Sequence, residues 1–144
     1  MKKYSFHILL VLLSLLAGAC YDYDDVTHEI GEASDQAFIS NMNVYDKDMK
    51  SVLKSKNIPA TQVGNDGIER FKEANAMPEI ILTVKSGTDL SCLILTATLS
   101  SQSSYAKISP VMGTLMDLSS PREFTVTSQS GKNVLKYKVT VETE

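Results

Sequence analysis

The sequence predicts an all-β protein, an antiparallel β-sandwich of about seven short strands, with a small barrel as the alternative architecture. Two observations support this fold class. From residue 36 onward, short runs of residues alternate between apolar and polar side chains, and turn-forming residues separate the runs at regular intervals. The clean alternation in the last runs also indicates an antiparallel sheet with one face in water.

The first two predicted strands have the weaker signals. Residues 38–44 alternate with an imperfect two-residue period, which predicts a partly irregular strand. The turn formers at residues 46–48 then precede a short run at residues 52–56. Aspartates and a lysine in this order are typical of a turn, so we expect residues 38–56 to form two strands joined by a tight connection.

The next segment predicts no strand. Residues 59–65 have the composition of a loop. Asp66 is followed three residues later by Glu69, the spacing of a capping box, and this predicts one short helix near residues 66–75. Pro78 would end such a helix.

The later half has five clearer runs, at residues 80–84, 92–99, 106–109, 124–126 and 135–141. Pro110 ends the third run, because proline has no amide hydrogen to donate to a neighbouring strand. The last two runs are expected to form a hairpin across the turn residues 129–132, in which Gly131 supplies backbone freedom.

The first 20 residues have the layout of an export signal. Two lysines precede an apolar run at residues 6–16, and small residues then lead to Cys20. As a helix, this run is well short of the roughly 30 Å of a bilayer core. The segment resembles the lipobox of bacterial lipoproteins, which implies that residues 1–19 are removed and that lipid on Cys20 anchors the chain in a membrane. The alternative is a plain secretory signal.

Charge divides the rest of the chain into two parts. Six acidic residues and no basic residue lie between Cys20 and Gln36, whereas the region from Gln36 to Glu144 is nearly neutral, with 12 basic and 11 acidic residues. We therefore expect an acidic tether at residues 20–35 and a single domain at residues 36–144. A near-neutral domain argues against nucleic acid as a partner.

The tether begins with an acidic motif, Tyr-Asp-Tyr-Asp-Asp at residues 21–25. This motif resembles the acidic export signal that follows the cysteine in surface-displayed lipoproteins of the Bacteroidota. The resemblance implies an outer-membrane location facing the cell exterior.

Five ordered motifs in the domain resemble a known module: GTDL at 87–90, AKISPVMGT at 106–114, DLSSP at 117–121, FTVT at 124–127 and YKVTV at 137–141. Together they are similar to an immunoglobulin-like N-terminal module of Bacteroidota surface lipoproteins, some of which continue into a domain assigned to carbohydrate metabolism. The resemblance implies an immunoglobulin-like sandwich. Because the chain ends shortly after the last motif, we expect no activity from such a following domain.

The domain offers no evident catalytic or metal chemistry. A glycosidase needs two carboxylates about 5 to 9.5 Å apart, one of them with a raised pKa. Asp89 and Asp117 instead stand singly in turns, and Asp46 with Asp48 falls short of the six to eight oxygens that calcium takes. We expect no enzyme, no metal and no cofactor.

Cys92 lies in a strand-like run and is predicted to be a small buried residue. With Cys20 lipidated, it has no disulfide partner. Both histidines of the chain precede residue 36, so neither a Cys/His dyad nor an ordinary zinc site is expected in the domain.

The aromatic residues give the candidate binding sites. The chain has no tryptophan. Phe38, Phe124 and Tyr137 fall on apolar faces and are predicted to lie in the core. Tyr45, beside a turn, and Tyr105, beside a serine-rich loop, are the candidate ligand-binding residues. We expect a non-catalytic binding or accessory module that captures a glycan; the alternative is a structural or adhesion scaffold that contacts another surface protein.

Overall fold

The computed structural model describes residues 32–73 and 77–144. The predicted signal peptide at residues 1–19, the lipidated Cys20 and the acidic motif at residues 21–25 lie outside the described residues, as does most of the predicted tether. The compact unit that contains the described domain runs from Ala33 to Glu144.

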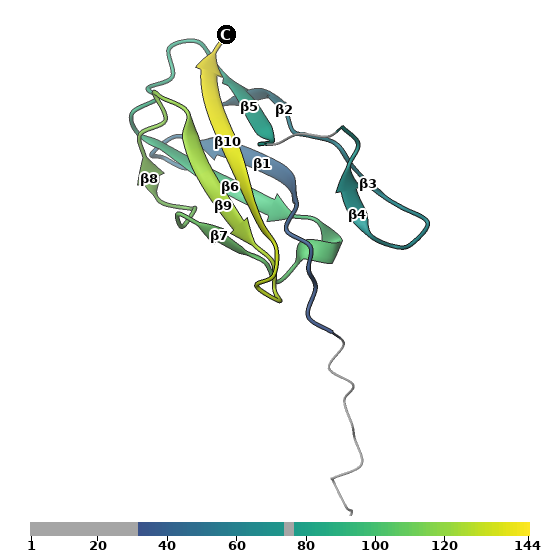
Figure 1. The fold of residues 1–144 in the computed structure, drawn as a ribbon. Helices are drawn as coiled ribbons and strands as arrows, with labels where there is room; N and C mark the ends of the chain where they lie inside the picture. The colour runs from purple at the N-terminus through teal and green to yellow at the C-terminus, as the bar shows by residue number, and fades with distance from the viewer. Residues whose placement is uncertain (1–31, 74–76) are drawn as a thin grey trace, which may run out of the picture. The chain divides into compact units, whose positions relative to one another are not determined.

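The described residues form ten β-strands, and eight of them build two packed sheets (Figure 1). The three-stranded sheet has the order β1-β6-β8, with β1 at Ile39–Tyr45, β6 at Leu93–Leu99 and β8 at Leu115–Met116. The five-stranded sheet has the order β2-β5-β10-β9-β7, with β2 at Leu53–Asn57, β5 at Glu79–Val84, β10 at Val134–Thr143, β9 at Arg122–Thr127 and β7 at Lys107–Ser109. The prediction of an all-β sandwich is confirmed.

Two details of that prediction were wrong. The strands are more numerous than seven, because β8 and the hairpin strands described below have only two or three residues, too few to show a period. The sheet is also not purely antiparallel. β10 pairs in parallel with β5, Lys138 opposite Glu79 and Thr143 opposite Val84, while every other strand pair of the described residues is antiparallel.

The core lies between the two sheets. Each sheet contributes the alternate residues of its strands, as the two-residue period requires. The largest side chains with almost no exposed surface are Tyr137, Phe124, Ile39, Met42, Ile80, Leu82, Leu93, Leu95 and Leu118. Phe38, Phe124 and Tyr137 are all buried, so the core prediction is confirmed for the three of them.

The imperfect period of β1 has a structural cause. The register of β1 against β6 shifts between Ile39 and Asn41, so Ser40 occupies a bulge and its hydroxyl donates to the carbonyls of Thr98 and Leu99. The extra residue interrupts the alternation, so Ile39 and Met42 are both buried although they are three residues apart.

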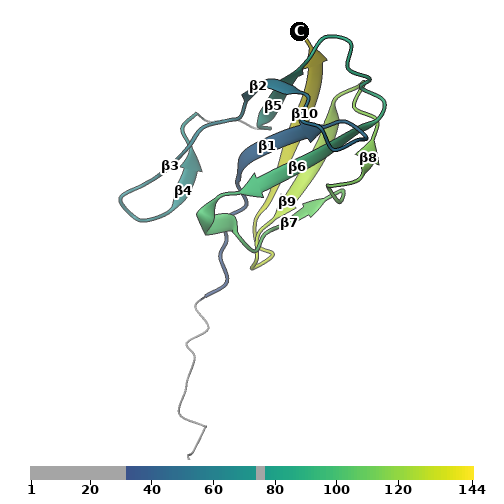
Figure 2. The same ribbon diagram turned by 180° about the vertical axis from the view of Figure 1, so that it is seen from behind.

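The predicted helix near residues 66–75 does not form. Residues 61–71 make a β-hairpin that projects from one side of the sandwich, with β3 at Thr61–Val63 and β4 at Glu69–Phe71 (Figures 1 and 2). Gly67 has a positive φ of 74° in the turn, and the Asp66 carboxylate accepts a hydrogen bond from the backbone N–H of Ile68. The Asp-Gly pair is therefore a signal for a hairpin turn, and the segment forms this turn and not the helix that the capping-box spacing predicts. Residues 59–65 are predicted as a loop but contain β3, because the Asp-Gly turn pairs this strand with β4.

The prediction for Cys92 was also wrong in part. Cys92 is half-exposed, one residue before β6, and has no disulfide. Within residues 32–73 and 77–144 there is no helix of the length and hydrophobicity that spanning a bilayer requires. The one helical element described is a single 3₁₀ turn, η2, at Ser101–Ser103.

Candidate functional site

The outward face of the five-stranded sheet is charged. Lys136, Lys138, Glu79, Glu123 and Glu142 alternate with the buried residues of β5, β9 and β10. Two ion pairs cross it, Lys138 Nζ to Glu79 Oε1 at 3.0 Å and Lys136 Nζ to Glu123 Oε1 at 2.9 Å. This is an ordinary solvated sheet face.

The outward face of the three-stranded sheet differs because it carries no charged residue. Met42 and Val44 of β1, Leu93 and Leu95 of β6 and Met116 of β8 point into the core. By alternation, the outward positions of these strands are Asn41, Asn43, Tyr45, Ile94, Thr96, Thr98 and Leu115. We call these seven residues the neutral face. Figure 2 views β1 and β6 from this side, in front of β9 and β10.

Strand register arranges the neutral face in rows. Tyr45 pairs with Ile94, and Ile94 pairs with Leu115, so one row crosses all three strands. Ile94 is only 7% exposed although its position alternates with the core residues Leu93 and Leu95. We attribute its burial to its cross-strand neighbours, Tyr45 and Leu115, because such pairs lie within side-chain contact distance. Tyr45 is half-exposed and Leu115 is 54% exposed, so the row presents an apolar and aromatic strip to solvent.

Two polar rows lie beside this strip. Asn43 pairs with Thr96, and Asn41 pairs with Thr98. Asn41 Oδ1 accepts hydrogen bonds from the Met42 N–H and from Lys56 Nζ, which reaches it from β2. Among the described residues, none donates to or accepts from the side chains of Asn43, Thr96 or Thr98. The amide and hydroxyl groups at the centre of the face are therefore free to bind a ligand.

The β1–β2 turn and the β5–β6 loop, which lie beyond the Tyr45 end of the face, enclose a shallow depression of about 550 Å³. Its charged lining residues are Asp46, Asp48 and Asp89 and the two lysines Lys47 and Lys85. Asp46 Oδ1 already accepts from the backbone N–H groups of Asp48 and Lys50, and Asp89 Oδ1 accepts from Ser91. The carboxylates of Asp46 and Asp89 therefore stabilise turns. The described part of the chain contains no group of three His, Cys, Asp or Glu side chains placed to hold a metal.

Tyr105 lies elsewhere, at the other end of the sandwich. It follows η2 and is 75% exposed. Tyr45 pairs near the start of β6, whereas η2 comes after its end at Leu99. The length of β1 between these points, six residues, corresponds to about 20 Å. The structure therefore does not bring the two predicted tyrosines together, and one small ligand cannot contact both.

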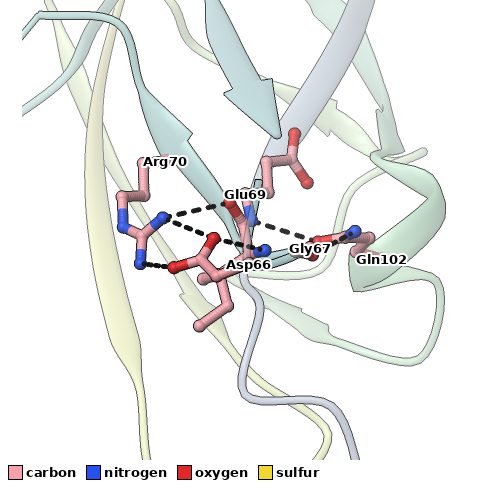
Figure 3. A network of polar contacts seen from close by, with 6 residues as sticks. Asp66, Gly67, Glu69, Arg70 and Gln102 are labelled. Atoms are coloured by element: carbon pink, nitrogen blue, oxygen red, sulfur yellow. Dashed lines mark hydrogen bonds and ion pairs between the residues drawn. The ribbon is translucent and has the colours of Figure 1, made fainter. Parts of the chain in front are cut away.

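The loop that carries Tyr105 is held by the β3–β4 hairpin (Figure 3). The side-chain amide of Gln102 donates to Gly67 O at 2.9 Å and accepts from Glu69 N–H at 3.2 Å, as a strand neighbour would. Arg70 and Asp66 form a two-point ion pair, with N–O distances of 3.0 and 2.7 Å. The pKa of Asp66 is lowered to about 2, mainly by the hydrogen bond from Arg70 and next by that from the Ile68 N–H. η2 is thus supported from one side, and the polar side chains that precede Tyr105, those of Gln102, Ser103 and Ser104, are already engaged in hydrogen bonds within the protein.

The sequence analysis missed most of the neutral face: Asn41, Asn43, Ile94, Thr96, Thr98 and Leu115. A signal for it exists in the sequence. Residues 90–106 contain no charged residue, and neither do residues 36–45. Only the pairing of β1 with β6 shows that these two uncharged stretches lie side by side.

These features define a small all-β module that combines a rigid sandwich with one uncharged, partly aromatic face. The chain belongs to the family described as SGBP, N-terminal, whose model matches residues 66–141, more than half of the chain. This match confirms the resemblance to an N-terminal module of Bacteroidota surface proteins. β6 and β8 lie inside the matched region, and β1 precedes it.

Two solved structures are similar to this chain. One, described as a "putative glycoside hydrolase" from Bacteroides thetaiotaomicron, is 31% identical with a TM-score of 0.42; the match covers 64% of this chain and 25% of that one. This chain therefore spans about a quarter of that protein. The other, described as a "putative secreted protein" from Bacteroides fragilis, is 13% identical with a TM-score of 0.43, and the match covers 76% of this chain and 98% of that one. No curated protein matches the chain.

Proposed function

We propose that this protein is a non-catalytic glycan-binding module on the cell surface, and that the neutral face is its binding site. The family name refers to glycan-binding surface proteins. The observation that carries the proposal is the row of Tyr45, Ile94 and Leu115 beside unpartnered amide and hydroxyl groups. An aromatic ring stacks on the apolar face of a sugar, while neighbouring polar groups bind its hydroxyls.

The state of the turn acids supports a non-catalytic role. Hydrogen bonds from Ser91 lower the pKa of Asp89, and hydrogen bonds from Ser119 lower the pKa of Asp117. A glycosidase needs one carboxylic acid with a raised pKa to protonate the leaving oxygen. Both carboxylates are shifted in the opposite direction, which suits turn-stabilising anions.

Tyr45→Ala is expected to weaken glycan binding about tenfold, equivalent to about 1.4 kcal/mol. Affinity electrophoresis of the full-length protein in detergent, through gels containing a panel of plant, host and microbial polysaccharides, measures this effect. Tyr45→Phe keeps the ring and should keep most of the affinity. Tyr105→Ala is the matched control on the other end of the sandwich and should bind as the unchanged protein does.

Two outcomes contradict this assignment, and a third requires other variants to decide it. Loss of binding in Tyr105→Ala with full binding in Tyr45→Ala would move the site to the η2 loop. Unfolding of Tyr45→Ala, seen in its circular dichroism, would make its loss of binding uninformative, and Tyr45→Phe and Asn43→Ala would then decide. Unaltered mobility on every polysaccharide would favour a scaffold that acts through protein contacts.

The anchor is part of the same proposal. A lipid on Cys20 would anchor the module in a membrane, because each buried methylene contributes about 0.8 kcal/mol and two or more chains anchor stably. The acidic motif at residues 21–25 supports the outer membrane, facing outward, as its location. Cys20→Ser is expected to abolish incorporation of a labelled fatty acid and to release the protein from the membrane fraction. Labelled, membrane-bound Cys20→Ser protein would contradict lipidation at this residue.

A further inference from the structure

We propose that the neutral face selects an uncharged glycan and excludes anionic ones such as uronic-acid or sulfated polymers. This inference rests on the proposed function and adds the chemical class of the ligand. Its basis is the contrast between the two outward sheet faces, one laced with ion pairs and the other without a charged residue at any of seven positions.

Recognition of a carboxylate or sulfate group requires cations in suitable positions, above all arginine, which binds such groups at two points. None of the seven face residues is charged. Lys56 is the one cation shown at the edge of the face by a hydrogen bond among the described residues, and its ammonium group is bound to Asn41 Oδ1. The neutral face therefore offers little to compensate the desolvation of an anionic sugar.

Charges of both signs border the other end, where Lys47 and Lys85 line the same depression as the acidic residues. Asp46 directly follows Tyr45, and Asp117 follows β8. The hydrogen bonds from Ser119 lower the pKa of Asp117, so its carboxylate is ionised at neutral pH. Arg122 lies near enough to Asp117 to help lower its pKa, and Lys47 follows Asp46, so these cations already have acidic neighbours and this end offers an anionic polymer no concentrated positive charge.

The polar groups that remain suit sugar hydroxyls. The carboxamide of Asn43 both donates and accepts, as do the hydroxyls of Thr96 and Thr98, and sugar hydroxyls need both kinds of partner. The face extends about 13 Å along β1 from Tyr45 to Asn41, and about 10 Å across three strands at the Tyr45 row, which is room for a short oligosaccharide. A short stretch of a longer neutral polysaccharide fits this surface.

A matched pair of threonine variants tests the inference. Thr96 lies at the centre of the neutral face, and Thr125 occupies an equivalent outward, half-exposed position on β9 of the opposite sheet. Thr96→Asp places a negative charge among the sugar-binding groups and should weaken binding at least tenfold. Thr125→Asp adds the same charge opposite Lys136 and should leave binding unchanged. Asn43→Ala removes a carboxamide without adding charge and should weaken binding about threefold.

The probes are three neutral polymers (dextran, galactomannan and xyloglucan) and two anionic ones (polygalacturonate and chondroitin sulfate), with full-length protein in affinity gels. We expect retardation by at least one neutral polymer, by neither anionic polymer, and with an affinity that does not change between about 0.05 M and about 0.5 M salt. Binding confined to anionic polymers, or equal effects of Thr96→Asp and Thr125→Asp, overturns the inference and leaves glycan binding itself standing. Retardation by none of the five polymers overturns the inference and counts against the proposed function as well.

Discussion

Glu69→Ala is expected to lower the free energy of unfolding by about 2 kcal/mol, because it removes the acceptor from a buried hydrogen-bond network. Glu69 is buried, with 6% of the residue exposed. Its carboxylate accepts from Thr61 Oγ1 at 2.6 Å and from Ser100 Oγ at 2.5 Å. Without it, the Ser100 hydroxyl loses its main acceptor, and a cavity remains beneath the β3–β4 hairpin.

The network also connects three parts of the chain that are distant in sequence. Ser100 Oγ lies 2.9 Å from Ser103 Oγ, which in turn accepts from the Phe38 N–H at 2.8 Å. Hairpin, η2 and the residue that precedes β1 are therefore held through one buried carboxylate. We expect Glu69→Ala to increase hydrogen exchange in both β4 and η2, since the bond between the Glu69 carboxylate and Ser100 connects these two elements.

Urea unfolding of Glu69→Ala and of Glu123→Ala compares a buried with an exposed strand glutamate. Glu123 lies on β9 with 47% of its side chain exposed and pairs with Lys136 at the surface. Its replacement should cost less than about 0.5 kcal/mol. Glu69→Gln keeps the size and one acceptor and should fall between the two. Equal stabilities for Glu69→Ala and Glu123→Ala would show that the buried network contributes nothing net.

The fold could be predicted from sequence wherever a strand is long enough to show its period. β10 alternates over ten residues, and its hairpin with β9 follows from the turn around Gly131, which has a φ of 76°. The β3–β4 hairpin could not be predicted with the same rules. Its strands have three residues each, and the spacing of Asp66 and Glu69 fits a capping box as well as a turn.

Glu69 shows why local spacing was insufficient there. A capping glutamate would bond back to the start of its own helix. Here its carboxylate bonds to Ser100, 31 residues away in sequence, and this contact exists only when η2 packs against the hairpin. The competing tertiary contact decides the secondary structure of the segment.

Of the seven residues of the neutral face, the sequence predicted only Tyr45 as a binding residue. The turn beside Tyr45 predicts this residue as a candidate, but Ile94, Thr96 and Thr98 of the same face lie on another strand about 50 residues later in the chain. Register determines that Asn43 faces Thr96 and that Tyr45 faces Ile94. A one-residue slip would turn all of these side chains into the core, so the face cannot be assembled before the pairing is known.

The free energy of unfolding is expected to fall at alkaline pH because of Tyr137, which is fully buried. Its hydroxyl accepts a hydrogen bond from the Ile39 N–H at 3.2 Å and lies 3.5 Å from Ala37 O, to which it donates. Burial raises the pKa of Tyr137 to about 12, the hydrogen bond from Ile39 acts in the opposite direction, and the nearby Glu69 carboxylate raises the pKa further. In the unfolded chain the pKa of a tyrosine is about 10.

The sign of the effect follows from these two values. Between pH 10 and about 12 the unfolded chain loses the Tyr137 proton and the folded protein keeps it. The unfolded state then binds fewer protons, so the free energy of unfolding falls as the pH rises, by about 1.4 kcal/mol per pH unit and about 2 to 3 kcal/mol over the whole interval. The contribution of Tyr137 is fully present below pH 10.

Tyr137→Phe isolates this contribution from that of the other tyrosines and the lysines. At neutral pH the variant should be less stable by about 1 kcal/mol, because the Ile39 N–H loses its acceptor inside the core. Above pH 10 it lacks the ionisation that destabilises the unchanged protein, so the two curves of unfolding free energy against pH should approach each other and cross before pH 12. Curves that stay parallel over this interval would show that the Tyr137 hydroxyl ionises equally well in the folded and the unfolded chain, and that the core around β1 and β10 admits water.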